Sequence, residues 1–219
     1  MNEFSPTERT KVKRLATRGF YDEETVYSIL DEAIICHVGF TINGRPFIIP
    51  TAYVRIKDCI YIHGAKSNRM INVISSGGEA CITVTLLDGY VLARSAFHHS
   101  MNYRSVVMFG KGEVVEDKEE KIAALKAFME HLMPNRWDDV RKPTDKELNA
   151  TSILKFRIEE ASAKIRTGPA VDDEEDYVLD VWAGVLPVRT TYGNLQRDEQ
   201  LKENVVEPEY LLNFISSKK

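Results

Sequence analysis

Two basic residues, Lys66 and Arg69, stand where the sequence predicts the start of a helix. They follow an apolar strand expected over residues 59–63, and the helix that they open carries apolar side chains on one face. The first backbone N–H groups of a helix are unpaired and carry partial positive charge, so an anion is stabilised there and a cation is not. A bound phosphate group would explain two cations at this position. The alternative is an ordinary N-cap by Ser67 or Asn68 beside two solvated bases.

His63 ends the expected strand immediately before this loop. It shares a strand face with Tyr61 and Cys59, because side chains alternate along a strand. The body of any phosphorylated ligand would lie beside it, and Gly64 would let that body approach the backbone closely. We therefore expect His63 to place a proton or a substrate near the ligand. The alternative is a core histidine whose ring nitrogens are satisfied.

A second candidate region, residues 97–105, is rich in hydrogen-bond donors and aromatic side chains. Loops of this kind usually carry function, although Tyr103 and Arg104 could also simply cover a barrel. His98 and His99 are adjacent and would point to opposite faces of a strand, so no metal site is expected from this pair. The chain also has neither a Rossmann glycine motif nor a P-loop, so a phosphate site must be of another design.

Composition limits the function further. The formal charge of -4 and the pI near 5.8 argue against a nucleic-acid surface, because phosphate backbones are bound by concentrated Lys and Arg. The basic segment 11–18 is expected to be a solvated tail. No apolar stretch approaches the roughly 20 residues that span a bilayer, and no leader pattern is visible, so we expect a cytoplasmic protein without membrane contact. The three cysteines, Cys36, Cys59 and Cys81, are expected to be buried and reduced.

Hydrophobic periodicity and turn residues predict many short strands with few helices. This pattern favours an antiparallel barrel of the α+β class, since strands do not alternate with long helices as parallel units require. The expected helices cover 23–33, 68–76, 118–132 and 145–149. The expected strands cover 33–41 and 47–55 around Asn43-Gly44, 59–63, 80–87 and 91–96 around Asp88-Gly89, 103–115 with a bend at Gly110 and Gly112, and 151–158 continued by 163–166; residues 172–176 are expected to form a solvated acidic loop.

The order of several motifs resembles the pyridoxamine 5′-phosphate oxidase-like, FMN-binding split-barrel family, and within it the nitroimidazole-resistance branch. The motifs are Ile49-Pro50-Thr51, the run 61–65 with Ser67 and Arg69, and the run 102–107 that leads to Gly110. The resemblance covers residues from about 14 to about 187. It implies a six-stranded antiparallel split barrel with flanking helices, and a homodimer with two flavins at the subunit interface.

The resemblance also assigns roles by position. Pro50, Thr51 and Ala52 would line the flavin ring, with His63, Gly64 and Ala65 beside it, while Lys66, Ser67, Asn68 and Arg69 would hold the phosphate. Tyr103, Arg104 and Ser105 would approach from the partner chain, and Trp182 would cover the ring. The family's oxidases carry an arginine followed by a histidine after that tryptophan. Here no histidine follows Arg189, so oxidation of pyridoxamine phosphate is not expected.

Three functions follow from these observations. The first is an FMN-dependent oxidoreductase acting on a small molecule, with His63 near the ring, or His98 or His99 from the neighbouring subunit. The second is a module that binds FMN or another phosphorylated ligand without catalysis, as a carrier or sensor. The third is a related barrel that uses haem or a deazaflavin. We expect residues 1–192 to form the barrel domain with its basic lead-in, and residues 193–219 to form a C-terminal extension.

Overall fold

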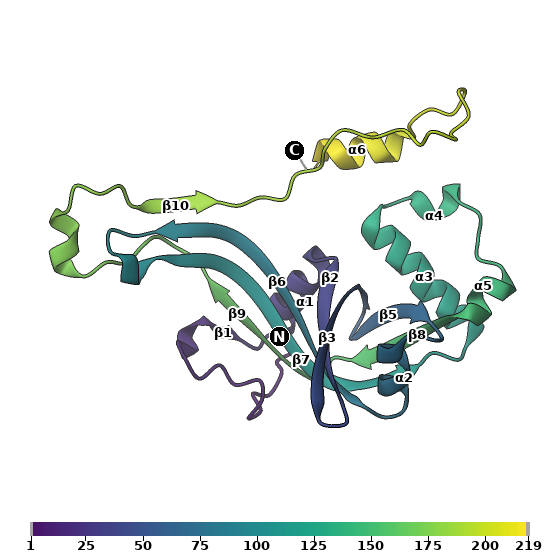
Figure 1. Ribbon diagram of the computed structural model, residues 1–219, viewed down its shortest axis with the longest axis horizontal. Coiled ribbons are helices and arrows are strands. Elements are labelled where there is room, and N and C mark those ends of the chain that lie inside the picture. The colour runs from purple at the N-terminus through teal and green to yellow at the C-terminus, as the bar shows by residue number, and fades with distance from the viewer. Residues whose placement is uncertain (1, 218–219) are drawn as a thin grey trace.

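The computed structural model describes residues 2–217, and within them ten strands form one continuous antiparallel sheet (Figure 1). The sheet curls into a barrel flanked by short helices, so the predicted α+β split-barrel class is confirmed, although with more strands than the six expected. The strands are β1 (Gly19–Phe20), β2 (Ile35–Ile42), β3 (Arg45–Ala52), β4 (Val54–Ile56), β5 (Cys59–Ala65), β6 (Glu79–Leu92), β7 (Ser100–Val114), β8 (Thr151–Arg157), β9 (Glu160–Arg166) and β10 (Gly184–Pro187). The α-helices are α1 (Glu23–Glu32), α2 (Arg69–Ser75), α3 (Lys118–Leu132), α4 (Arg136–Asp139), α5 (Asp145–Ala150) and α6 (Glu209–Ser217).

Strand β7 pairs with different strands along one of its edges. The main strand order is β3-β2-β6-β7-β8-β5-β4, and β9 also pairs with β7. One edge of β7 pairs with β6 as far as Lys111, while the other edge pairs with β9 as far as Phe109 and with β8 from Gly112. A Cβ atom at Gly112 would lie 2.6 Å from a side-chain carbon of Ile74 and 2.7 Å from the ring of Phe156. The bend expected at the glycines of β7 is confirmed, and Gly112 is needed there because no side chain fits.

The prediction of a hairpin around Asp88-Gly89 is wrong. Strand β6 runs straight through these residues, and its pairing with β7 only shifts register between Leu87 and Gly89. Such a shift marks a β-bulge, which uses the same residue types as a tight turn. The chain reverses later, through a short 3₁₀ helix over Ala96–His98, so β7 begins at Ser100 and not at Tyr103.

Strand β9 continues β8, as expected. Both run antiparallel to β7 in nearly the same register, from Val114 opposite Leu154 to Tyr103 opposite Arg166. Only Ile158 and Glu159 separate the two strands. On its other side β8 pairs with β5, and β9 pairs with β1. The two consecutive strands therefore act as one long bent strand that joins two parts of the curled sheet.

Local capping residues set the helix boundaries. The Asp22 carboxylate accepts a hydrogen bond from the Thr25 N–H at 2.8 Å, and Asp117 starts α3 in the same way. Thr144 and Glu147 form a reciprocal capping box at α5. These helices begin where the sequence predicted them. The main core lies between α1, α2 and the inner face of the sheet, and a smaller core lies beneath α3.

Beyond the barrel, β6 and β7 extend as a long hairpin arm, and β10 lies along the arm (Figure 1). The chain then returns across the molecule to α6, where the Tyr210 hydroxyl donates a hydrogen bond to Asp139 in α4 at 2.7 Å. A C-terminal extension was expected over 193–219, and helix α6 lies within this segment. None of the described helices is both long and apolar enough to cross a membrane.

Candidate functional site

The start of α2 is capped by Asn68. Its side-chain oxygen accepts hydrogen bonds from the N–H groups of Met70 at 2.9 Å and Ile71 at 3.3 Å. The cap therefore exists, and Asn68 makes it while Ser67 stays exposed. Two of the unpaired helix donors are thereby satisfied, so an anion at this end would depend mainly on side chains and on the loop before the helix.

The two cations of this loop have no acidic partner. The Arg69 guanidinium lies over the Phe47 ring, 4.5 Å from the ring centroid, and both Lys66 and Arg69 are exposed. Within residues 2–217, no carboxylate forms an ion pair with either side chain. The Lys66 backbone N–H donates to the Ala150 carbonyl at 3.2 Å, which fixes the loop against α5. The loop is therefore held by backbone bonds while its charges remain available, and this arrangement fits a phosphate group.

His63 lies on the strand face that was predicted for it. Its ring packs edge-on against Phe128 of α3, with the ring centroids 4.5 Å apart. Tyr61, on the same face, donates a hydrogen bond to Glu120 of α3 at 2.8 Å. Although the His63 side chain is partly open to solvent, the surrounding protein atoms desolvate it and lower the pKa of His63. The ring is therefore held mainly neutral near pH 7, and can accept a proton or a metal bond.

Pro50, Thr51 and Ala52 end β3, which is the edge strand beside β2. An edge strand leaves alternate N–H and C=O groups unpaired, so a ligand can bond to its backbone. Pro50 contributes only a carbonyl, because proline has no N–H. Strand β3 also contacts β5, which leads to Gly64 and the phosphate loop. The structure thus brings the residues from 50–52 and 63–69 to neighbouring strands.

The second predicted group lies on β7. Arg104 is already engaged, since its guanidinium donates two hydrogen bonds to Asp88, at 2.7 and 3.0 Å, and two to Glu32, one of them at 2.8 Å. These carboxylates, Glu32 foremost, raise the pKa of Arg104. Ser105 donates to the Lys164 carbonyl at 3.2 Å, and Tyr103 is half-buried. The Arg104 charge is therefore neutralised by ion pairs within the chain, and the assignment of Arg104 to the cofactor stays a prediction.

Trp182 has 69% of its surface exposed. It lies just before β10, where its ring packs so closely on Gly184 that a Cβ there would come within 2.9 Å of it. Figure 1 shows this segment at the far end of the arm from α2. One chain therefore does not bring Trp182 and the phosphate loop together.

Alternate residues of β9, β7, β6, β2 and β3 form a common surface that we call the outer sheet face. Cross-strand partners share a face, so the register defines it. Its apolar exposed members include Ile35 and Ile48, at 56% and 70% exposure. The face also contains a hollow of about 580 Å³ beside His37 and Gly39. The outer sheet face comprises Arg166, Tyr103 and Leu87 in one row, Lys164, Ser105 and Thr85 in the next, and Val107, Thr83, His37 and Pro50 in a third.

Sequence reasoning did not single out His37. The alternation of buried Cys36, Val38 and Phe40 with more exposed residues would have placed the His37 ring on the opposite face of β2. Of the three cysteines, Cys36 and Cys59 are buried as expected, whereas Cys81 is half-buried and lines the hollow; all three thiols are free. Burial raises the pKa of Cys36 to about 12, so its thiol is not reactive near neutral pH.

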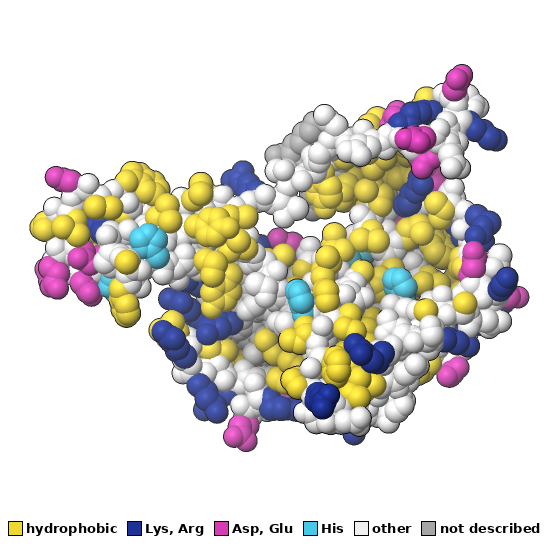
Figure 2. All heavy atoms as spheres, viewed as in Figure 1, with side chains coloured by type: hydrophobic (Ala, Val, Ile, Leu, Met, Phe, Trp, Pro, Cys, Tyr) yellow, Lys and Arg dark blue, Asp and Glu magenta, His cyan; other side chains and the backbone are white. Residues whose placement is uncertain are grey.

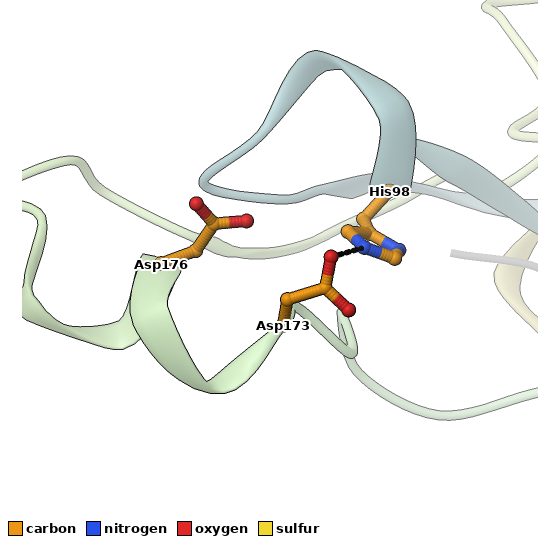
Figure 3. A group of neighbouring side chains, drawn as sticks. All are labelled: His98, Asp173 and Asp176. Carbon is orange, nitrogen blue, oxygen red and sulfur yellow. Dashed lines mark ion pairs between the residues drawn. The ribbon is translucent and has the colours of Figure 1, made fainter.

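The acidic run 172–176 is not simply a solvated loop. The Asp172 carboxylate is covered and accepts hydrogen bonds from the N–H groups of Arg94 and Ser95, at 2.9 and 3.3 Å. Beside it, His98, Asp173 and Asp176 lie together (Figure 3), with the His98 ring 3.2 Å from the Asp173 carboxylate. These contacts hold the turn of the arm against the segment before β10. The Asp173 side chain is 68% exposed, as suits an ion pair that fixes a turn.

The chain is similar to a known protein family and to several solved structures. The family model described as pyridoxamine 5′-phosphate oxidase matches residues 22–165. A search of curated protein sequences found no match. Among solved structures, the flavocytochrome Anf3 from Azotobacter vinelandii is 40% identical, covers 96% of this chain and 98% of its own, and superposes with a TM-score of 0.90.

Two further structures differ in how much of the chain they share. The FAD and haem binding protein from Mycobacterium smegmatis is 31% identical, with a TM-score of 0.86, and covers 90% of this chain and 96% of its own. A candidate 5-nitroimidazole antibiotic resistance protein from Bacteroides thetaiotaomicron is 28% identical, with a TM-score of 0.56, and covers 66% and 84%. The similarity to the first two must therefore extend well into residues 166–219, beyond the part that the family model matches.

Proposed function

This chain belongs to the pyridoxamine 5′-phosphate oxidase family, and on that premise we propose that it binds a flavin nucleotide and acts as an oxidoreductase. The observation that carries the proposal is the 40% identity to a flavocytochrome over 96% of the chain. A bound flavin supplies electron and hydride transfer at its ring, while the protein supplies binding and orientation.

The residues at the start of α2 support flavin binding. Lys66 and Arg69 are exposed cations without a described acidic partner, on a loop fixed by backbone hydrogen bonds. We propose that they hold the flavin phosphate, with Ser67 and Asn68 in the same loop. His63, Gly64 and Ala65 and the free edge of β3 from Pro50 to Ala52 then lie where the ring would follow. The neutral His63 ring can donate or accept a proton beside it.

We further propose that the active form is a homodimer. The phosphate loop and the segment with Trp182 lie far apart within one molecule, so a site that uses both needs two chains. The outer sheet face and the arm expose large apolar residues, among them Ile48, Phe97 and Val178, at 70%, 88% and 82% exposure. Figure 2 shows a narrow gap between the C-terminal segment and the barrel, with hydrophobic side chains beside it. Tyr103 and Ser105, which lie on the outer sheet face, would then face the partner's flavin.

The flavin itself is FMN or FAD. The resemblance to the split barrels implies FMN, whereas the similar protein from Mycobacterium smegmatis is named for FAD. Chromatography of the flavin released from the purified protein, with mass spectrometry, identifies which one is bound.

Haem is a second candidate cofactor, favoured by one observation. The two solved structures that cover at least 90% of this chain are both named for a haem or cytochrome function. Haem iron is commonly held by a neutral histidine, and the chain fits this requirement. His37 and His63 are exposed, and neither ring has a hydrogen-bond partner within residues 2–217. We propose that one of them would hold the haem iron; loss of the Soret band in His37→Ala or His63→Ala supports this, and its persistence in both variants contradicts it.

The experiment that tests the main proposal is the absorbance spectrum of the purified protein, followed by anaerobic addition of NADPH or NADH. We expect flavin bands that bleach on reduction and recover with a quinone or nitro compound. A protein without flavin that also ignores added FMN and FAD would overturn the proposal. Flavin that raises the melting temperature but is never reduced would instead favour a carrier or sensor, since selective binding to the native state stabilises it.

A further inference from the structure

Arg166, at the end of β9, is buried, and no carboxylate among residues 2–217 pairs with it. Its exposure is only 7%, and its guanidinium donates hydrogen bonds to the Asn102 side chain and to the carbonyls of Gly168 and Pro169, the last at 3.2 Å. The Nε atom is covered and has no partner among the described residues. A guanidinium stays charged in proteins, and a buried charge needs a counter-charge. Neutral acceptors alone therefore leave Arg166 uncompensated.

Two further cations lie beside Arg166. Lys164 is two residues earlier on the same strand and face, and its backbone pairs with Gly19, directly after Arg18. Desolvation, and then the charge of Arg18, lowers the pKa of Arg166, as a group of like charges does. In the part of the chain that the structure describes, neither Arg18 nor Lys164 forms an ion pair. Arg18, Lys164 and Arg166 therefore belong to the paired strands β1 and β9 or to the residue directly before them, and none of the three has an ion-pair partner among the described residues.

The surrounding surface strengthens this charge. Residues 11–20 contain Lys11, Lys13, Arg14 and Arg18 and no acidic residue. Figure 2 shows Lys and Arg side chains gathered over this N-terminal segment. The chain as a whole carries a charge of -4, so this surface is a local exception.

Other arginines show that the fold supplies acids where an arginine is structural. Arg104 is paired with Asp88 and Glu32, and Arg94 is paired with the covered carboxylate of Asp172. Arg166 is more buried than either of them, yet in the part of the chain that the structure describes it forms no ion pair. The counter-charge that this position needs is therefore expected to come from a ligand.

We propose that Arg18, Lys164 and Arg166 form an anion site for a phosphate group of a dinucleotide. Arg166 pairs in register with Tyr103, and Lys164 with Ser105, so the site lies on the outer sheet face that the proposed dimer turns toward the partner's flavin. The inference rests on the proposed function. The phosphate on the flavin side is assigned to Lys66 and Arg69, so a second anion site matches the second phosphate of a dinucleotide. That phosphate belongs to FAD itself or to a nicotinamide dinucleotide donor.

The test compares Arg18→Gln, Arg166→Gln and the charge-conserving Arg166→Lys, with Lys126→Gln as control, because Lys126 is an exposed cation on α3 far along the chain. We expect FAD to bind about tenfold more weakly to both Gln variants and FMN to be unaffected, since only the charge-assisted bond to the second phosphate is lost. Arg166→Lys is expected to retain most of the FAD affinity. If FAD and FMN affinities are unchanged but the KM for NADPH rises about tenfold, the phosphate belongs to the donor.

The site is disproved if no variant changes FAD affinity or KM, or if FAD and FMN weaken equally. If Arg166→Gln does not fold, Arg18→Gln tests the site by the same criteria. The Arg18 side chain makes no described hydrogen bond, so this variant should fold. Inorganic pyrophosphate provides a readout that needs no flavin. It should raise the melting temperature of the wild type and the control more than that of Arg18→Gln. If the wild type holds no flavin but shows this shift, the proposed function is contradicted and the anion site is supported. If pyrophosphate shifts the melting temperature of all variants equally, the anion site is contradicted.

Discussion

Arg69 at the start of α2 and Arg104 in the middle of β7 carry the same side chain, but only Arg104 is paired with carboxylates. Arg69 lies over the ring of Phe47, with its charge open to solvent, whereas Arg104 bridges Asp88 and Glu32. Both were expected at the cofactor from their places in the sequence. The difference shows that position alone does not make a cation a ligand-binding residue; its charge must also be uncompensated.

This comparison separates two roles for arginine. Arg104 links the end of α1 to the bulge of β6, across residues that are distant in sequence. Arg69 forms no ion pair with any residue from 2 to 217, so removing it should leave the fold intact and reduce ligand binding. The predictions below test this division, beginning with the largest expected effect.

Arg69→Ala should weaken flavin binding by about 1.5 to 3 kcal/mol, the scale of a lost hydrogen bond to a charged group. Arg104→Ala, made in parallel, should leave flavin affinity within about twofold, a difference of less than half a kcal/mol. Fluorescence titration of each variant measures both. Equal losses in the two variants would show that Arg104 reaches the cofactor despite its carboxylates.

Asn68 allows the helix cap and the anion site to be tested apart. Asn68→Ala should lower the free energy of unfolding by about 1 kcal/mol, since it removes the acceptor for the N–H groups of Met70 and Ile71. Asn68→Asp should keep the cap and the stability, because aspartate caps as well as asparagine and suits the helix dipole. Its negative charge should nevertheless weaken flavin binding. Urea melts and titrations of both variants check this, and an undiminished affinity in Asn68→Asp would place the phosphate elsewhere.

Arg104→Gln should lower the free energy of unfolding by about 1 kcal/mol, because bridging ion pairs that are partly open to solvent contribute little more. A double-mutant cycle with Glu32→Gln, followed by urea unfolding, measures the part that belongs to this pair. Additive effects would mean that the Glu32 contact adds nothing to stability.

His63 should give the smallest effect, a slope of stability with pH. Desolvation lowers the pKa of His63 in the folded state, so the unfolded chain binds its proton at a higher pH than the folded chain does. Stability is therefore complete above the ordinary histidine pKa near 6.5 and falls as the pH drops through that value toward the lowered one. Urea midpoints between about pH 7.5 and 5 should fall less steeply in His63→Gln than in the wild type. Identical slopes would mean that the ring is fully solvated.

The features that sequence predicted best depend on neighbours within a few residues. Helix α3 begins after Asp117 and ends at Leu132 as expected, and α5 begins at Asp145, where a short helix was expected. The loop at 66–69 belongs to this class, since its strand, cap and helix are all local. Capping and periodicity act over one or two turns, so they can be read from a short stretch.

The features that sequence missed depend on distant partners. The residues Asp88-Gly89 satisfy a turn by themselves, and only the pairing of β6 with β7 and β10 makes them a bulge. The carboxylate that holds Arg94 comes from Asp172, and those that hold Arg104 come from Glu32 and Asp88. No local sequence pattern predicts which carboxylate will form an ion pair with which arginine. Whether an arginine is available to a ligand is therefore a property of the fold.

Strand β6 uses one of its edges twice. Near its beginning that edge is bonded to β2, through Cys81 to Thr83, and near its end it is bonded to β10, through Gly89 to Leu92. Without β10, the outer part of the edge would present unpaired N–H and C=O groups beside exposed apolar side chains, which is a template for strand-to-strand aggregation. The C-terminal segment that the family model does not match thus also keeps the arm from polymerising, and a chain shortened before β10 should be lost to aggregates before its cofactor can be examined.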